Sequence, residues 1–263
     1  MMRRTFKWND DWKFSKENIC VIERRSVLEQ GTWQNVNLPH TWNGVDGQDG
    51  GNDYYRGTCY YVKQLRKSDV DDAKCVFIEF AGTNSSAELF VNGYKVTHHD
   101  GGYSTWRTDI TKFIKEENEI VLAVDNGSNN YVYPQMADFT FYGGVYRDVS
   151  IICVPKIHFD LEYYGGSGIK VTPLIQEDRA EIEVEFYLTN ATGSESVFCS
   201  VSDGVQEIVQ KTVSSVKTYL SMIISIVHLW YGLKDRFLFT LKFELNKNSE
   251  FLVCFSTWFG CRS

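Results

Sequence analysis

The most particular stretch of this sequence is a long loop, Leu38 to Gly57, which combines glycines, carboxylates, amides and aromatic residues. Aromatic faces stack on the apolar C–H face of a pyranose, carboxylates and amides bond to its hydroxyl groups, and glycines let the backbone approach. The loop therefore has the chemistry of a sugar-binding segment. The same composition also suits a structured surface loop with satisfied turns, so both interpretations stay open from the residues alone.

A second segment, residues 138–149, runs from a loop into a strand and contains a double glycine and an Arg-Asp pair. Asp138 precedes the strand, at a position where loop residues of a β-sandwich often reach a ligand. For Arg147 and Asp148 we expect structural roles. A partly buried arginine needs an acidic partner, and we expect Arg147 to pair with a carboxylate inside the fold.

The remaining residues do not predict an independent active site. Glycoside hydrolysis usually requires two carboxyl groups, about 5 to 5.5 Å apart for retention or about 6.5 to 9.5 Å apart for inversion, and the sequence does not single out such a pair. The adjacent acids Asp71-Asp72 and Glu116-Glu117 lie in polar connections, which favours a solvated surface. No GxSxG turn, GxGxxG motif or GxxxxGK[ST] loop is present in the sequence. We predict no catalytic residue in this chain.

The histidines and cysteines indicate no metal site. His98 and His99 are neighbours on an expected strand, so their side chains should point to opposite faces of a sheet. The seven cysteines are scattered without a CxxC pair, which is typical of thiols in a reducing compartment. Met1 to Phe14 lacks the apolar stretch of a secretory signal. We expect a cytoplasmic protein that uses no metal and no cofactor.

Charge and hydropathy exclude two classes of partner. Lys and Arg number 27 against 34 for Asp and Glu, a net charge of -7, and no long basic run is available to neutralise a phosphate backbone. We expect no nucleic-acid partner. The longest apolar run, Met222 to Trp230, is about half of the roughly 20 residues that cross a bilayer, so we expect no membrane span.

Short runs rich in β-branched and aromatic residues must position these loops. The expected strands of the first half are Thr58–Leu65, Cys75–Phe80, Ala87–Val91, Glu119–Val124 and Val145–Val154. Asn92-Gly93 separates two such runs, and both residues tolerate the positive φ angles of a type I′ hairpin turn. Few helical patterns interrupt the runs. This spacing predicts an all-β fold of sandwich or barrel type.

The character of the sequence changes after Val154, where we place a domain boundary. Polar and apolar residues alternate from Glu181 to Phe186, which predicts an antiparallel strand with one solvated and one buried face. Further strands are expected at Val197–Val201, Val205–Val213, Phe237–Leu245 and Phe251–Ser256. Their number suits an immunoglobulin-like sandwich of about 100 residues. The apolar residues of Ser214 to Val227 fit neither strand nor helix period cleanly.

The first half resembles the sugar-binding jelly-roll domain that opens family 2 glycoside hydrolases of the β-galactosidase kind. The resemblance rests on an ordered set of motifs: Trp12-Lys13-Phe14, Leu38-Pro39-His40-Thr41-Trp42-Asn43, Asp49-Gly50-Gly51-Asn52-Asp53-Tyr54-Tyr55-Arg56-Gly57, Val91-Asn92-Gly93, Gly101-Gly102-Tyr103 and Phe141-Tyr142-Gly143-Gly144-Val145-Tyr146-Arg147-Asp148-Val149. The second half is similar to the immunoglobulin-like domain that follows in that family. The resemblance implies a jelly-roll β-sandwich over residues 1–154 and an immunoglobulin-like β-sandwich over 155–263.

In this family a TIM barrel with both catalytic glutamates comes next, and we expect this chain to stop before it. The resemblance implies the non-catalytic front part of a retaining β-glycosidase, which supports the barrel and lines one wall of its β-galactoside pocket. Asp138 matches an aspartate that contacts the terminal sugar, and Asn52 or Asp53 should line the same pocket. Relatives often assemble through these domains, which implies a homo-oligomer.

Some positions depart from the family pattern, and other functions stay open. Arg236 stands where a proline is common and Trp258 where an arginine is common, and Ser214 to Val227 fits poorly. A truncated or decaying gene product, or errors in the sequence, would account for these departures and for a missing barrel. The alternatives are a free-standing carbohydrate-binding module without catalysis and an intracellular β-sandwich scaffold.

Overall fold

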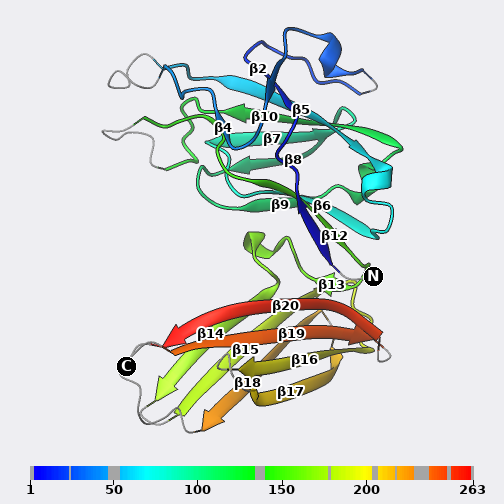
Figure 1. Ribbon diagram of the computed structural model, residues 1–263, viewed down its shortest axis with the longest axis vertical. Coiled ribbons are helices and arrows are strands. Elements are labelled where there is room, and N and C mark those ends of the chain that lie inside the picture. Colours follow the sequence, from blue (N-terminus) through cyan, green and yellow to red (C-terminus); the bar gives the residue numbers. More distant parts are fainter. Residues whose placement is uncertain are drawn as a thin grey trace. The chain divides into compact units, whose positions relative to one another are not determined.

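A computed structural model of the chain describes residues 3–23, 25–46, 54–133, 140–176, 179–202, 207–216, 218–227, 237–247 and 250–261. The chain divides into two compact units, Thr5–Cys153 and Val154–Ser263, and the second unit also includes Met1–Arg4. Both units are built of β-strands, joined in places by single turns of 3-10 helix (Figure 1). The predicted all-β class is therefore confirmed.

The larger sheet of the first unit carries most of the features discussed below. Its strands, in spatial order, are β3 (Gln34–Val36), β2 (Trp12–Ser15), β5 (Thr58–Arg66), β10 (Glu117–Asp125), β7 (Ser86–Val91) and β8 (Tyr94–Asp100). Strand β10 lies between β5 and β7 and runs antiparallel to both, with Ala123 opposite Tyr60 on one side and Glu88 on the other. The side chains of β10 alternate between the two faces of this sheet.

A second, four-stranded sheet completes the sandwich of the first unit. Its strands are β1 (Arg4–Lys7), β12 (Val149–Val154), β6 (Cys75–Phe80) and β9 (Trp106–Asp109), in that spatial order. A two-stranded sheet joins β4 (His40–Thr41) to β11 (Gly144–Val145). Short 3-10 turns, labelled η1, η2 and η3, lie at Val27–Glu29, Lys67–Asp69 and Thr111–Phe113.

The core of the first unit lies between these two sheets. Tyr61 and Leu122 of the six-stranded sheet join Ile78 and Ile151 of the four-stranded sheet in one cluster, and none of the four side chains is exposed. A smaller cluster of Ile19, Val27, Val62 and Val121 covers part of the opposite, outer face of the six-stranded sheet. The chain before β3 therefore packs over one end of that outer face. The rest of the outer face is free to carry polar side chains.

The second unit is also a sandwich of two sheets. One contains β13 (His158–Phe159), β15 (Arg179–Thr189), β14 (Ile169–Gln176) and β18 (Tyr219–Val227), and the other contains β17 (Glu207–Val216), β16 (Glu195–Ser202), β19 (Phe237–Lys247) and β20 (Glu250–Cys261). The turn η4 spans Tyr163–Gly165. Ile182, Val184 and Phe186 alternate into the core and meet Val197 and Cys199 of the facing sheet.

Most predicted strands correspond to observed ones, with small shifts at their ends. Cys75–Phe80 is β6 without change, and Thr58–Leu65 becomes β5, one residue longer. The predicted strand Val145–Val154 is divided between β11 and β12. Asn92 and Gly93 adopt φ angles of 53° and 83° between β7 and β8, so the predicted hairpin turn is confirmed.

Strand β18 falls in the stretch whose period was ambiguous. Met222 and Ile224 point into the core, whereas Ile223 is 52% exposed. An apolar side chain on the outward face conceals the alternation that normally identifies a strand. Pairing with β15 determines the register instead, with Ile224 opposite Ile182.

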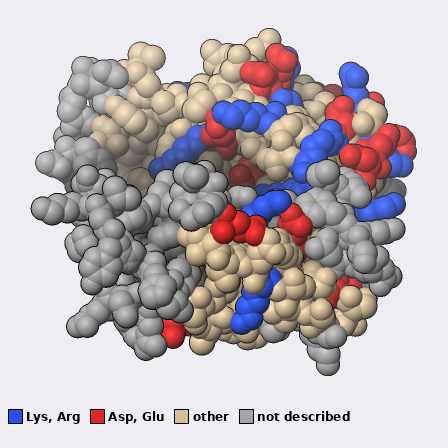
Figure 2. Space-filling view, turned by 60° about the horizontal axis from the view of Figure 1, so that its bottom comes forward, with Lys and Arg blue, Asp and Glu red and all other residues tan. Residues whose placement is uncertain are grey.

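The described residues contain no helix with the length and apolar character needed to cross a bilayer. Acidic and basic side chains intermingle over the coloured part of the surface in Figure 2. Exposed pairs such as Lys67 with Glu116, 2.8 Å apart, and Lys95 with Glu88, 2.5 Å apart, neutralise charges locally. The adjacent acids Asp71-Asp72 and Glu116-Glu117 are solvent-exposed, as predicted for them.

Candidate functional site

Four backbone segments meet where β5 begins and β10 ends, in the first unit. They are 40–46, 54–57, the residue after β10, and 140–145, and we call their meeting point the loop-end site. Each of the two segments singled out from the sequence contributes to it. The polar side chains that hold the segments together are buried asparagines.

Asn43 is the central residue of the loop-end site and has no exposed surface. Its Nδ2 donates hydrogen bonds to Asp46 Oδ1 and to the carbonyl of Tyr55, both at 3.0 Å. Its Oδ1 accepts a bond of 2.8 Å from the Gly143 N–H and one of 3.1 Å from Asn126 Nδ2. One side chain therefore joins three segments that are far apart in the sequence, and all its hydrogen-bonding groups are used.

Asn126 follows the last residue of β10 and is 1% exposed. Its Oδ1 accepts the Gly57 N–H at 2.9 Å, and its backbone carbonyl accepts Arg56 Nε at 3.0 Å. Its Nδ2 also lies 3.5 Å from the carbonyl of Phe141. The amide thus fixes the start of β5 against the segment that precedes β11.

Asp46 closes the long loop at its base. Its Oδ2 accepts the Tyr55 N–H at 3.0 Å, so the two ends of residues 46–55 are held together. Although its burial acts in the opposite direction, the bonds from Tyr55 and Asn43 hold the pKa of Asp46 below its usual value. The carboxylate stays ionised at neutral pH and keeps accepting both bonds.

The double glycine is required by close packing. A Cβ on Gly143 would lie 2.1 Å from Trp42 Cζ2, and one on Gly144 would lie 2.4 Å from the His40 carbonyl oxygen. Gly144 also has a φ of +130°, which side-chain-bearing residues rarely adopt. Only glycines allow this segment to lie directly on Trp42 and to pair with β4.

His40, in β4, packs against residues of β2 and β5 next to the loop-end site. Its Nδ1 lies 2.8 Å from the Tyr61 hydroxyl, and its ring packs against Phe14 with centroids 4.8 Å apart. Burial, assisted by the nearby Lys16 charge, lowers the pKa of His40. The imidazole is therefore neutral at pH 7, as its aromatic surroundings require.

An aromatic hollow of about 240 Å³ opens beside the loop-end site. Its lining includes Thr41, Asn84, Tyr103, Phe141, Tyr142 and Tyr146. Asn84 Nδ2 donates to the Tyr142 carbonyl at 2.8 Å, and the Tyr146 hydroxyl donates to the Gly102 carbonyl. Such a surface suits the C–H face of a sugar ring, with few polar groups to restrict which sugar lies there.

The three residues predicted to bind substrate, Asn52, Asp53 and Asp138, lie outside the described residues. Their flanking segments are described, and these meet at Asn43 and Asn126. Asn52 and Asp53 belong to the loop closed by Asp46 and Tyr55, and Asp138 lies three positions before Phe141.

Arg147 and Asp148 contact neighbouring strands and turns, in line with the structural roles expected for them. Asp148 lies 2.8 Å from Lys7 Nζ and accepts Asn9 Nδ2 at 2.8 Å. Arg147 donates to the carbonyls of Tyr103, at 2.9 Å, and Ala81, at 3.3 Å, instead of to the carboxylate that the sequence suggested. The guanidinium is exposed and stays hydrated, so it does not require an acidic partner.

The two asparagines that organise the site could not be identified as site residues from the sequence. Asn43 ends the motif Leu38–Asn43, and Asn126 follows a predicted strand in the sequence Asp-Asn-Gly. Composition gives no sign that either amide is buried. Within the described part of the chain, no three His, Cys, Asp or Glu side chains are grouped to hold a metal ion.

Comparison with known proteins identifies relatives of the chain. Residues 8–155 match the family model described as glycosyl hydrolases family 2, sugar binding domain. A β-glucuronidase of Bacteroides fragilis is 30% identical over 260 residues, which cover 94% of this chain and 36% of that protein. A β-galactosidase of Thermoanaerobacter pseudethanolicus is 26% identical over 234 residues, covering 82% of this chain and 31% of that protein. The chain thus spans roughly a third of the length of these relatives.

Solved structures extend the likeness to both units. The crystal structure of an FMN-binding β-glucuronidase from Faecalibacterium prausnitzii L2-6 is 34% identical, with a TM-score of 0.82. The match covers 98% of this chain and 39% of that one. A β-glucuronidase from Parabacteroides merdae has the same TM-score of 0.82 at 20% identity, a likeness of fold.

Proposed function

This chain belongs to family 2 of the glycosyl hydrolases, and we propose from that membership that it lines one wall of the sugar pocket of a retaining β-glycosidase. The observation that carries the proposal is the loop-end site. Asn43 and Asn126 bind the ends of both segments that contain the predicted sugar-binding residues. A rigid base of this kind is what a ligand-binding loop needs, because ordering a free loop on binding costs conformational entropy.

The proposed substrate is a terminal β-linked sugar. Asp138 would accept hydrogen bonds from its hydroxyl groups, and Asn52 or Asp53 would contact the same ring. The names of the relatives divide between β-galactosidase and β-glucuronidase. The sequence favoured a β-galactoside, and the two substrate classes differ in the configuration at C4 and in a carboxylate at C6, so an assay with both distinguishes them.

We propose further that residues 1–154 and 155–263 are separate domains and that catalysis belongs to a barrel outside this chain. The division between Cys153 and Val154 supports the boundary. The proposed setting is carbohydrate metabolism in the cytoplasm, which the scattered cysteines support. Assembly into a homo-oligomer is also proposed.

The test compares the 263-residue chain with the same chain extended in frame through the sequence that follows Ser263 in the gene. Both are assayed with chromogenic β-galactoside and β-glucuronide. We expect hydrolysis only by the extended form. In that form Asp138→Asn should lower kcat/KM by at least about tenfold, because a hydrogen bond to a charged group contributes about 1.5–3 kcal/mol.

Asp71→Asn is the matched control, since Asp71 is an exposed carboxylate of the same unit. Its kcat/KM should equal that of the unsubstituted enzyme. Hydrolysis by the short chain would overturn the assignment of catalysis to another domain. Equal activities of the Asp138→Asn and Asp71→Asn enzymes would overturn the role of Asp138.

A further inference from the structure

A cleft lies on the outer face of the six-stranded sheet, on the side opposite the sandwich core. The register of strands β5, β10, β7 and β8 places two rows of neighbouring residues across this face. The first row is Thr58, Asp125, Ser86 and Asp100, and the second is Tyr60, Ala123, Glu88 and His98. The cleft has a volume of about 360 Å³, near the lower end of the roughly 300–1,000 Å³ of small-molecule sites. A cleft of this volume can hold one small ligand ring.

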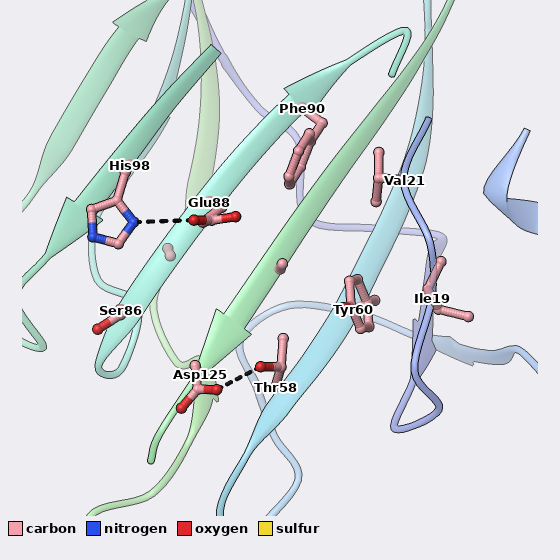
Figure 3. A pocket seen from close by; sticks show the side chains of 11 residues that line it. Ile19, Val21, Thr58, Tyr60, Ser86, Glu88, Phe90, His98 and Asp125 are labelled. Atoms are coloured by element: carbon pink, nitrogen blue, oxygen red, sulfur yellow. Dashed lines mark hydrogen bonds and ion pairs between the residues drawn. The ribbon is translucent and has the colours of Figure 1, made fainter. Parts of the chain in front are cut away.

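The floor of the cleft exists because a small side chain lies between two large ones. Ala123 is opposite Tyr60 on one side and Glu88 on the other, so its methyl group leaves a hollow between them. The segment before β3 raises the wall beside Tyr60 with Ile19 and Val21 (Figure 3). The Tyr60 ring thus flanks the cleft as an aromatic surface backed by aliphatic residues.

Polar groups occupy the other side and one end of the cleft. Asp125 Oδ2 accepts the Thr58 hydroxyl at 2.5 Å, and the Glu88 carboxylate faces His98, with His98 Nδ1 3.6 Å from Glu88 Oε1 (Figure 3). Ser86 adds a hydroxyl that is held by Asp100 at 2.9 Å. A ring that enters therefore meets an aromatic face on one side and hydrogen-bond acceptors and hydroxyls on the other.

Burial, with the nearby Glu88 charge, raises the pKa of the Tyr60 phenol. The phenol therefore stays protonated at neutral pH and can donate a hydrogen bond. Two carboxylates, Glu88 and Asp125, line the cleft, while Lys95, the cation bonded to Glu88, is not among the lining residues. Lys95 still offsets the Glu88 charge from outside the cleft, at 2.5 Å, so the like charge that a ligand carboxylate would meet is that of Asp125. The cleft therefore favours neutral ligands that are rich in hydroxyl donors.

We propose that this cleft is a second carbohydrate site, which binds one neutral sugar ring by stacking on Tyr60 and by hydroxyl bonds to Glu88 and Asp125. Aromatic stacking with carboxylate acceptors is the chemistry by which proteins hold pyranoses. The cleft adjoins the loop-end site at Thr58 and Asp125, but none of its lining residues belongs to that site, and it opens on the outer face of the sheet. It binds without the barrel, so it does not rest on the proposed function.

The test is a titration of the isotopically labelled 263-residue chain with methyl β-galactopyranoside, followed by NMR. We expect shifts at the Ala123 methyl and at the backbone amides of Ser86 and Glu88, with saturation in the millimolar range. Methyl β-galactopyranosiduronate, the same ring with a carboxylate at C6, should bind at least about tenfold more weakly, because it lacks the C6 hydroxyl donor and its carboxylate meets the Asp125 charge. Equal binding of the two sugars, or no shift at these groups, would overturn the proposal.

Substitutions inside and outside the cleft test whether the sugar binds there. Tyr60→Ala should weaken binding by about tenfold, and Ala123→Leu should abolish it by filling the floor while keeping the sheet intact. Tyr94→Ala is the matched control, since Tyr94 is an exposed tyrosine of β8 outside the cleft. If Tyr60→Ala does not fold, Ala123→Leu still decides. Undiminished binding by folded Ala123→Leu would place the sugar elsewhere and refute the site.

Discussion

Two buried amides, Asn43 and Asn126, connect backbone segments that lie up to 100 residues apart in the sequence. A single hydrogen bond contributes little net free energy, since the unfolded chain bonds to water instead. A buried group left without a partner is far more expensive. The value of these side chains is therefore that they satisfy many backbone groups in a place that water does not reach.

Asn43→Ala tests this at the residue scale. It leaves the Gly143 N–H without its acceptor, and an unsatisfied buried group costs about 1–3 kcal/mol. It also removes the bonds of Asn43 to Asp46, Tyr55 and Asn126, each worth about 0.5–1.5 kcal/mol, while Asn126 Nδ2 keeps its contacts with the carbonyls of Tyr55 and Phe141. We expect the free energy of unfolding of the first unit to fall by about 2–4 kcal/mol, measured by urea denaturation with tryptophan fluorescence.

Asn35→Ala is the control for this measurement. Asn35 is exposed on β3, and its bond to Lys13 is at the surface. Its loss should change the unfolding free energy by no more than about 0.5 kcal/mol. Comparable losses for the two variants would show that burial of Asn43 is not the source of its effect.

The β7–β8 hairpin illustrates how a turn depends on a neighbouring element. Asn92 Nδ2 bonds to the Phe113 carbonyl at 2.9 Å and to Asn118 Oδ1 at 3.0 Å, so the turn is attached to the start of β10. A Cβ on Gly93 would lie 2.5 Å from the Ile22 carbonyl oxygen. The dipeptide therefore satisfies the turn geometry and the packing of the chain that crosses over it.

Gly93→Ala should destabilise the first unit by about 1–3 kcal/mol, because it forces a strained φ and a backbone clash. Thermal unfolding followed by circular dichroism measures the effect. Gly44→Ala is the control, since the atoms nearest to its added Cβ lie at 3.6 and 3.8 Å and its φ is not positive. A Tm for Gly93→Ala equal to that of Gly44→Ala would contradict the proposed strain.

At the scale of the whole molecule, each unit has its own apolar core. Trp12, Tyr61 and Ile78 belong to the core of the first unit, and Phe186 and Val197 to that of the second. Each core is enclosed between two sheets of its own unit. Such units should respond separately to a change that damages only one core.

Phe186→Ala, which should cost about 3–5 kcal/mol, is expected to speed hydrogen exchange in β15 and β16 and leave β5 and β10 unchanged. Ile78→Ala is the reciprocal variant, which should speed exchange in β5 and β10 and leave β15 and β16 unchanged. Hydrogen exchange with mass spectrometry of both variants makes the comparison. Loss of protection in both units after either substitution would argue against separate domains.

The sequence by itself determined the all-β class, most strands and the hairpin at Asn92-Gly93. These follow from local alternation and from turn chemistry, which a few neighbouring residues decide. It also predicted the exposure of Asp71-Asp72 and Glu116-Glu117. The ordered motifs of the first half indicated the family, because their spacing is specific even where each motif alone is weak.

Only the tertiary structure decided which polar residues are buried and which small residue forms the floor of a cleft. Asn43 and Asn126 become neighbours by folding, and Ala123 forms the floor of a cleft because of the strands on either side. The same holds for β18, whose outward Ile223 hides its period until β15 supplies the register. Pairing across strands joins residues far apart in the chain, and no local pattern in a sequence carries that information.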